Sequence, residues 1–587
     1  MALPKLKTGG KLIIGLVLIG ALGYGLNIFM DKTGIGTQTT ESSTAPKADI
    51  GTANTLGAAP SKITIAPVAA ENSQPIKLLT IAWNGTMGLQ YANGAPVTAA
   101  DSLMAKRGVK LTIERQDDYS KMLEEQLLFA KDVADGKPNP RGAAFVIIMG
   151  DGYPAYIAGA QENFKKLNNQ LQVIGAIGRS LGEDTCMMKS EVKGNPQAAR
   201  GSLIGAVLRD GDWNICVKWA ADNDIPINPN EKTFDPDAIN FVSTASFVEA
   251  DEKYIAGYCE TRPVVNKGKL TGEKRKVCQD GSATWTPGDV KIAKAKGGVV
   301  KVASTKEYKN QMATVIIGNR DWMAKNKPLV ENFLAAAYEG SDAVRASDAN
   351  LLKGAKVSAM VYNEETAEYW AKYFKGVTEP DKNGVPIALG GSAVMGLGDA
   401  INYFGLNGAD DTYKRVYDVF GGFTKHYYPD ILPQLVKYED VVNKIYMQSL
   451  ASKSTFAPST EAQFEAPAGK TLTTFAKKSY AIEFETGKAT FTQGANEVLD
   501  NLANQVTVTG LYVQLNGHTD AIGNPATNLE LSKRRAEAVK TYLMTNANMP
   551  TERIIVRALG DTQPLADNTT KAGQARNRRV EVLLKSE

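Results

Sequence analysis

One aspartate and one arginine near the C-terminus have the types and spacing to bind a small zwitterionic group. Asp520 follows an apolar run inside the segment NGHTDAIGNPATNLELSKRRA, which extends from Asn516 to Ala536. The helix expected after this segment's aspartate has an apolar stripe, and Arg535 lies on that stripe. A guanidinium directed toward a core requires an anion, either from the protein or from a ligand. The stripe consists of Leu531, Arg535, Ala538, Val539 and Tyr542.

A helix that begins just after Asp520 would hold both side chains at one end of the fold. We predict that it begins at Asn528 as the N-cap, with Glu530 near the positive end of the helix dipole. Asp520 could then accept hydrogen bonds from an ammonium, and Arg535 could bind a carboxylate through two parallel hydrogen bonds. The alternative is a plain Asp520–Arg535 salt bridge that joins loop to helix.

The unit from about residue 475 to 587 resembles the OmpA-like peptidoglycan-binding domain. The resemblance rests on IEF at Ile482, GHTDAIG (Gly517 to Gly523), Asn528, LSKRRAEAV (Leu531 to Val539) and NRRVEV (Asn577 to Val582). It implies an α+β fold with the order βαβαββ, and recognition of diaminopimelate in the peptide stem of peptidoglycan.

The same resemblance implies roles for particular residues. Asp520 and Arg535 match the positions that hold the amino-acid end of diaminopimelate in that family. We assign Thr519, Gly523 and Asn528 to the ligand-binding loop beside them. We expect Arg578 and Arg579 to lie in the last strand and to be structural.

The composition of the chain limits the classes of function. At 587 residues it is expected to form three or four folding units, and its net charge of +4 gives no sign of a nucleic-acid-binding surface. The chain has two histidines, which argues against a histidine-rich metal site. It contains no nucleophile elbow, phosphate loop or metal-ligand spacing, so we expect neither an enzyme nor a cofactor.

An uncharged apolar stretch near the N-terminus, Leu12 to Met30, is long enough to cross a bilayer. Three lysines precede it, so residues 1–11 should stay in the cytoplasm and the rest of the chain should be exported. We therefore predict a single-pass protein of the bacterial inner membrane with its bulk in the periplasm. The alternative is a cleaved signal peptide, with Ala21 and Gly23 as small residues before the cut.

Four cysteines lie in the middle of the chain. In an exported protein an even number favours two disulfides over a metal site. We favour the pairs Cys259–Cys278 and Cys186–Cys216, although sequence alone allows the other pairings.

Two stretches rich in small and polar residues, 31–74 and 454–474, are expected to be flexible linkers. They bound a middle domain at 75–453 and the C-terminal domain at 475–587. The middle domain alternates strand and helix signals, which indicates α/β layers. Helices are expected from Tyr119, after Pro328, and from an Asn363 cap to Gly376. Strands are expected within 77–85, 108–118, 143–154, 239–247, 299–308 and 313–322.

The middle domain is similar to periplasmic solute-binding proteins of the two-lobed type. The stretch TVIIGNRDWMAKNKPLVENFLAAAYEGSDAV is similar to segments of the binding proteins for sulfonate, nitrate and thiamine-precursor uptake. The resemblance implies a small solute held between two lobes. For an anionic solute, backbone N–H groups after Gly85 and Gly152 would contribute. Ligands of open α/β sheets lie beyond the carboxyl ends of strands, which predicts a solute site at Trp83, Asn84, Thr86, Asp151, Tyr153 and Ser304.

A second function has the same layout. One N-terminal span followed by an OmpA-like domain also resembles the B subunit of the ion-driven flagellar stator. The protein would then be a stator-like or transducer subunit with an integral-membrane partner, and its middle domain would be a protein-interaction spacer. Such subunits need a carboxylate within the span, whereas Asp31 lies only at its exported edge.

Overall fold

The computed structural model describes residues 61–69, 72–456, 459, 464–467, 469–485 and 487–587. The expected cytoplasmic segment, the anchor at 12–30 and most of the first linker lie outside these residues. Within the described ranges, no helix has the length and apolarity needed to cross a bilayer.

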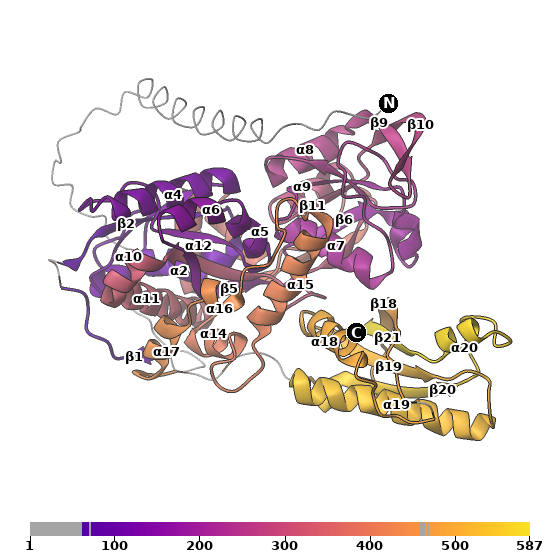
Figure 1. Cartoon of the computed structure of the whole chain (residues 1–587). Helices are drawn as coiled ribbons and strands as arrows, with labels where there is room; N and C mark the ends of the chain where they lie inside the picture. The colour runs from indigo at the N-terminus through magenta and orange to yellow at the C-terminus, as the bar shows by residue number, and fades with distance from the viewer. Residues whose placement is uncertain (1–60, 70–71, 457–458, 460–463, 468, 486) are drawn as a thin grey trace, which may run out of the picture. The chain divides into compact units, whose positions relative to one another are not determined.

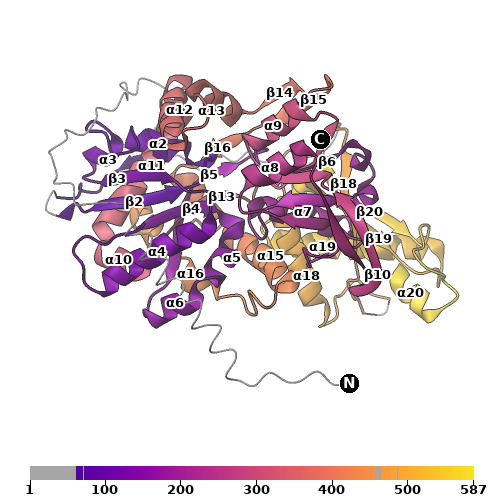
Figure 2. The same cartoon turned by 90° about the horizontal axis from the view of Figure 1, so that it is seen from above.

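The first lobe of the middle domain is built on a six-stranded sheet in the order β16-β5-β13-β4-β2-β3 (Figure 2). Strands β3, β2 and β4 are parallel, and β13 lies antiparallel between β4 and β5. Every residue of β4 and β13 is buried, because helices cover both faces. The strands are β2 (Pro75–Thr80), β3 (Lys110–Arg115), β4 (Phe145–Met149), β5 (Leu171–Ser180), β13 (Ala313–Asn319) and β16 (Ser392–Val394).

The helices of this lobe follow the expected capping chemistry. Asp118 caps α4 by accepting from the N–H of Ser120 at 2.9 Å, and Pro328 lies in the first turn of α11. The helices are α2 (Met87–Asn93), α3 (Leu103–Lys106), α4 (Tyr119–Ala134), α5 (Tyr153–Ala158), α6 (Gln161–Lys166), α10 (Arg320–Lys325), α11 (Lys327–Ala346) and α12 (Asp348–Tyr362).

The helix predicted from Asn363 begins later than expected. Asn363 is the left-handed residue that ends α12, with φ 50°. Helix α13 (Ala367–Lys375) is capped by Thr366, whose hydroxyl accepts from the N–H of Tyr369. Asparagine tolerates the left-handed conformation well, so it serves a helix end as readily as a helix start.

The second lobe, where β6 and β11 are labelled in Figure 1, has a five-stranded sheet in the order β12-β6-β11-β7-β8. A disulfide between Cys186 and Cys216 joins β6 to α7, and a second one, Cys259–Cys278, joins the hairpin strands β9 and β10. This is the pairing favoured from the sequence. The elements are β6 (Thr185–Lys189), β7 (Leu203–Ala206), α7 (Gly211–Asp222), β8 (Asn240–Ser243), α8 (Phe247–Ala256), β9 (Cys259–Asn266), β10 (Lys269–Cys278), β11 (Gly281–Thr284), α9 (Gly288–Ala295) and β12 (Val299–Ser304).

The chain crosses between the two lobes twice. Residues 181–184 join β5 to β6, and residues 305–312 lead from β12 back to β13. Each stretch predicted to hold a strand does contain one, and the two-lobed α/β architecture follows from these crossings. The remaining elements are β14 (Val377–Pro380), β15 (Pro386–Leu389), α14 (Leu397–Tyr403), α15 (Thr412–Tyr427), α16 (Tyr438–Val441) and α17 (Ile445–Ala451).

The middle domain begins earlier than the predicted linker boundary. Strand β1 (Lys62–Ile63) pairs with β17 (Ser454–Thr455), and Ile63 is buried in the core. The backbone oxygen of Ile63 also accepts a hydrogen bond from Arg107 at 3.1 Å. The end of the expected first linker and the start of the second therefore belong to the middle domain.

The C-terminal domain has its own hydrophobic core and a four-stranded sheet in the order β18-β21-β19-β20. The predicted order βαβαββ is present, with a short helix added before the last strand. Helix α19 packs on β19 and β20. The elements are β18 (Thr473–Tyr480), α18 (Ala495–Thr507), β19 (Tyr512–His518), α19 (Pro525–Asn546), β20 (Ile554–Gly560), α20 (Lys571–Asn577) and β21 (Val580–Ser586).

Two predicted boundaries in this domain are wrong. Helix α19 is capped by Asn524, which accepts from the N–H of Ala526 at 2.8 Å, and Asn528 lies inside the helix. Pro525 decides the start, because proline fits the first helical position and has no N–H to satisfy. Arg578 and Arg579 precede β21 and do not lie in the last strand.

Candidate ligand-binding sites

The loop that follows β19 holds Asp520 at the edge of the C-terminal sheet. The side chain of Asp520 is 12% exposed, and its Oδ1 accepts from the backbone N–H of Ile522 at 3.1 Å. Its Oδ2 accepts from Nη1 of Arg578 at 2.7 Å. The carboxylate is therefore fixed by a local turn and by a cation that sequence reasoning had placed elsewhere.

Arg535 lies beside this carboxylate without pairing to it. Arg535 is 3% exposed, its Nε donates to the backbone oxygen of Lys488 at 3.1 Å, and its guanidinium lies 4.9 Å from the ring centre of Phe484. Among the described residues, no carboxylate forms a salt bridge with it. Burial, and then the charge of Arg578, lower the pKa of Arg535, whereas the charge of Asp520 acts in the opposite direction. The expected alternative, a plain Asp520–Arg535 salt bridge, is not formed.

Three further residues predicted for this site shape the loop. Asn528 donates from Nδ2 to the backbone oxygen of Asp520 at 3.3 Å, so it ties α19 to the loop. Thr519 donates its backbone N–H to Gly560, and its buried hydroxyl has no hydrogen-bond partner within the described ranges. Gly523 has φ +101°, a conformation that other residues rarely adopt.

In the middle domain, the carboxyl end of β2 meets the first crossing between the lobes. Nε1 of Trp83 donates to Oδ2 of Asp184 at 3.1 Å, and the backbone N–H of Asn84 donates to Oε1 of Glu183 at 3.4 Å. From the other lobe, Nε1 of Trp285 donates to the backbone oxygen of Ala82 at 2.9 Å. These bonds join residues 82–84 of the first lobe to the crossing at 183–184 and to Trp285 of the second lobe.

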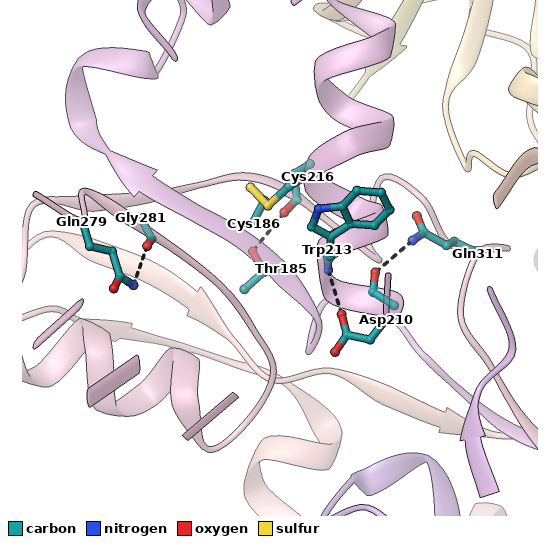
Figure 3. Close-up of a disulfide and its surroundings, with 10 residues drawn as sticks. Thr185, Cys186, Asp210, Trp213, Cys216, Gln279, Gly281 and Gln311 are labelled. Atoms are coloured by element: carbon teal, nitrogen blue, oxygen red, sulfur yellow. Dashed lines mark hydrogen bonds between the residues drawn. A yellow bond between two sulfur atoms is a disulfide. The ribbon is translucent and has the colours of Figure 1, made fainter. Parts of the chain in front are cut away.

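Asp151 extends this contact to the second lobe. Its Oδ2 accepts from Nε2 of Gln311 at 2.7 Å and from Nδ2 of Asn214, on α7, at 3.3 Å. Figure 3 shows the start of α7, where Asp210 accepts from the backbone N–H of Trp213 at 3.0 Å. The Cys186–Cys216 disulfide holds this helix against β6.

Five carboxyl groups converge in this region, which we call the acid cluster: Asp151, Glu183, Asp184, Asp210 and Asp212. None is more than 4% exposed. Burial raises the pKa of Asp151 and of Asp184 to about 7 and that of Asp210 to about 8, and the negative charges of neighbouring members add to the rise for Asp184 and Asp210. Burial also raises the pKa of Glu183 and Asp212.

The other predicted solute-site residues have partners inside the fold. The hydroxyl of Thr86 bonds to the backbone oxygen of Trp83 and contacts the hydroxyl of Tyr362. The hydroxyl of Tyr153 lies 2.9 Å from the backbone oxygen of Leu171 and 3.0 Å from that of Val441, and its one proton can be donated to either. The hydroxyl of Ser304 donates to Glu307 at 2.7 Å. The structure brings Trp83, Asn84 and Asp151 together at the acid cluster, whereas Thr86, Tyr153 and Ser304 form hydrogen bonds to other parts of the fold.

Comparison with known proteins identifies the C-terminal part of the chain. The sequence model of the OmpA family matches residues 483–578. These residues form an OmpA family domain. The two residues at the centre of its loop site, Asp520 and Arg535, both fall within the match.

Relatives match the chain over the OmpA domain. Outer membrane protein A of Bordetella avium is 40% identical over 100 residues, which are 17% of this chain and 51% of the relative. The peptidoglycan-binding protein ArfA of Mycobacterium bovis is 33% identical over 104 residues, which are 18% of this chain and 32% of the relative. The chain thus spans about half of the first of these relatives and about a third of the second.

A solved structure resembles the middle domain in outline. The periplasmic nitrate-binding protein NrtA from Synechocystis PCC 6803 covers 66% of this chain and 90% of its own length, with 10% sequence identity and a TM-score of 0.45. The two-lobed assignment of the middle domain rests on its own sheet order and crossings.

Sequence reasoning missed several residues at both sites. Arg578 of the OmpA domain belongs to the paired arginines of NRRVEV, and only the fold shows which of the two reaches Asp520. Glu183 and Asp184 form the acidic pair of LGED between two strands, a signal that could have been read as a crossing. Asp210 and Asp212 flank the start of a helix, where carboxylates are ordinary capping residues.

Proposed function

We propose that this protein binds peptidoglycan through its OmpA domain, with Asp520 accepting the ammonium and Arg535 binding the carboxylate of diaminopimelate. The observation that carries the proposal is the state of Arg535. It is 3% exposed, lies beside Asp520 and has no carboxylate partner among the described residues. A buried guanidinium without a counter-charge is poised for an anionic group from outside.

The sequence of the N-terminus supports the location that this function requires. We propose that Leu12 to Met30 anchors the chain in the inner membrane, with the domains in the periplasm. The two disulfides support an exported compartment, since such bonds persist in oxidising surroundings. In this arrangement the protein connects the membrane to the cell wall.

The middle domain supplies the second half of the proposal. We propose that it binds a small solute between its lobes, without catalysis, and presents that solute to an integral-membrane partner. The two crossings and the buried polar groups where the lobes meet support this assignment, because ligand sites in α/β sheets lie beyond the carboxyl ends of strands.

The test of the wall-binding proposal is co-sedimentation of the full chain, in detergent, with purified sacculi that contain diaminopimelate. We expect the protein to pellet with the sacculi and free diaminopimelate to release it. Retention in the supernatant, or binding that free diaminopimelate leaves unchanged, would show that the OmpA domain of this chain has another ligand.

A further inference from the structure

The place where the two lobes meet contains more buried hydrogen-bond acceptors than donors. Within the described ranges, Oδ1 of Asp151, Oδ1 of Asp184 and both carboxyl oxygens of Asp212 have no hydrogen-bond partner. An unpartnered buried acceptor loses its hydration without compensation, so a group of them calls for a donor that comes from outside the chain.

Buried amide side chains at the same place show the same imbalance. Asn84 is fully buried, and neither atom of its amide has a partner among the described residues. Oε1 of Gln311 and Oδ1 of Asn214 are also unpartnered there, although both residues donate to Asp151. An amide oxygen only accepts hydrogen bonds, so each of these oxygens needs a donor, either from a protonated acid of the cluster or from a ligand.

The charge of the acid cluster is not balanced from within the chain. In the described part of the protein, none of the five carboxyl groups forms a salt bridge with a lysine or an arginine. A cation beside the first crossing, Lys301, is already engaged, since its Nζ donates to Asp289 and to the backbone oxygen of Gly182, each at 2.9 Å. Buried acids without a counter-charge keep their protons to higher pH, as the raised pKa values of the cluster indicate, and a bound cation would stabilise their ionised form.

We propose that the solute of the middle domain is an organic cation rich in N–H donors, an amine or a guanidine, held between the lobes by the acid cluster. This inference rests on the proposed solute-binding function and names its ligand class. Ammonium and guanidinium groups supply several charge-assisted hydrogen bonds each, which matches the unpartnered carboxylate and amide oxygens. An anion would bring further acceptors to a place that already has an excess of them, so this proposal differs from the anion site expected at the backbone N–H groups after Gly85 and Gly152.

The unpartnered carboxyl and amide oxygens belong to several separate segments of both lobes. An organic cation suits this arrangement, because its N–H groups are distributed along the molecule. A metal ion instead requires oxygen ligands converging within about 2.0 to 2.6 Å of one point. No such group of carboxylates is present in the described ranges. We therefore expect no calcium binding, and calcium is included among the probes to test this.

The test is isothermal titration calorimetry on the dialysed full chain in detergent, with spermidine and agmatine as probes. Tetramethylammonium has the same charge and no N–H group, and it serves as the control for hydrogen bonding. We expect spermidine or agmatine to bind, and tetramethylammonium, nitrate and calcium to give no heat of binding. Native mass spectrometry of the undialysed chain then identifies any solute that co-purifies.

Variants connect binding to the acid cluster. Asp212→Asn is the sharpest of them, because neither carboxyl oxygen of Asp212 bonds within the described fold and the change breaks no internal hydrogen bond. For the probe that binds the parent protein, we expect this variant to raise the dissociation constant by about tenfold or more. Asp184→Asn is a second variant at the crossing. Glu162→Gln, an exposed acid on α6, is the control and should leave affinity unchanged.

The outcomes separate this inference from the proposed function. If nitrate, calcium or a neutral solute binds or co-purifies, the middle domain binds a solute and the assignment of an organic cation is wrong. If no probe binds and no solute co-purifies, both are wrong. If an amine binds but Asp212→Asn and Asp184→Asn bind as the parent does, the cation lies elsewhere and the acid cluster is structural.

Discussion

Nη1 of Arg578 donates to Oδ2 of Asp520 at 2.7 Å, and this pairing leaves the buried Arg535 beside them without a carboxylate. The side chain of Arg578 is 44% exposed, so water screens its attraction for Asp520. In the proposed binding mode, an incoming ammonium would compete with a weak partner for Asp520, while an incoming carboxylate would meet a guanidinium at Arg535 that has no carboxylate partner among the described residues.

Single changes at the two central residues should remove wall binding. Asp520→Ala removes the acceptor for the ammonium and Arg535→Ala removes the donor for the carboxylate, and each should weaken sacculus binding by roughly tenfold or more. Co-sedimentation with sacculi measures the effect, and we expect the melting transition of the OmpA domain to change little. Arg534→Ala, an exposed neighbour on α19, is the matched control. A double variant that still pelleted with sacculi would exclude this site.

The outer arginine of the loop should be dispensable. Arg578→Ala breaks a partly exposed ion pair, which contributes about 0.2 to 1 kcal/mol to stability. Because Asp520 remains held by the N–H of Ile522, we expect sacculus binding to persist. The measurement is the same pelleting assay beside Arg535→Ala. Equal losses in the two variants would show that both arginines bind the ligand carboxylate.

The acid cluster predicts how the stability of the ligand-free middle domain changes with pH. Aspartate in an unfolded chain titrates near about 4, whereas Asp151 and Asp184 titrate at about 7 and Asp210 at about 8 in the fold. Between these limits the folded state keeps protons that the unfolded state has lost, so the free energy of unfolding falls as pH rises. We expect a lower melting temperature at pH 8 than at pH 5.5.

Tryptophan fluorescence isolates this transition from that of the OmpA domain. All six tryptophans of the chain lie between Trp83 and Trp370, within the middle domain. Asp184→Asn removes one titrating group and should reduce the dependence on pH. If the melting temperature of the ligand-free protein is no lower at pH 8 than at pH 5.5, then water or another group stabilises the ionised acids of the cluster.

The pH dependence of solute affinity should have the opposite sign. An amine remains protonated up to about pH 10, while Asp151 and Asp184, with a pKa of about 7, and Asp210, with a pKa of about 8, lose their protons over the range around those values. Binding of spermidine or agmatine should therefore become tighter across that range and release protons. Titrations in two buffers of different ionisation enthalpy measure the protons released. Affinity that weakens as pH rises would contradict ion pairing with the cluster.

The two disulfides should differ in their response to a reductant. Both cysteines of Cys186–Cys216 are fully buried, whereas Cys278 is exposed at the edge of a hairpin. Dithiothreitol should open Cys259–Cys278 first in the folded protein, as alkylation and mass spectrometry would show. Replacing Cys186 and Cys216 by serine should lower the free energy of unfolding by about 3.6 kcal/mol, given their separation of 30 residues. Opening of the buried bond first would show that the second lobe unfolds locally.

The sequence was sufficient for the architecture because apolar periodicity and strand spacing are local signals. Each strand predicted in the middle domain is present, and so is the order βαβαββ of the C-terminal domain. The start of α19 was misplaced because Asn524 and Asn528 are equally good caps, and Pro525 selects the earlier one.

The contacts that make the sites were harder to predict because they depend on long-range geometry. Asp151, Asp184 and Asp210 are far apart in sequence, and each alone is ordinary loop or capping chemistry. Only the crossing of the chain between the lobes brings them together and buries them. Arg578 likewise reaches Asp520 through the pairing of β21 with β19.

The indole bonds of Trp83 and Trp285 join the lobes across the acid cluster, at 3.1 Å to Asp184 and 2.9 Å to Ala82. If the proposed solute is enclosed there, it would leave only after these bonds break and the lobes separate. Its residence time would then be set by the frequency of lobe opening, and much less by its own contacts. A receptor of that kind, fixed to the wall, would release its cargo mainly when a partner pulls the lobes apart.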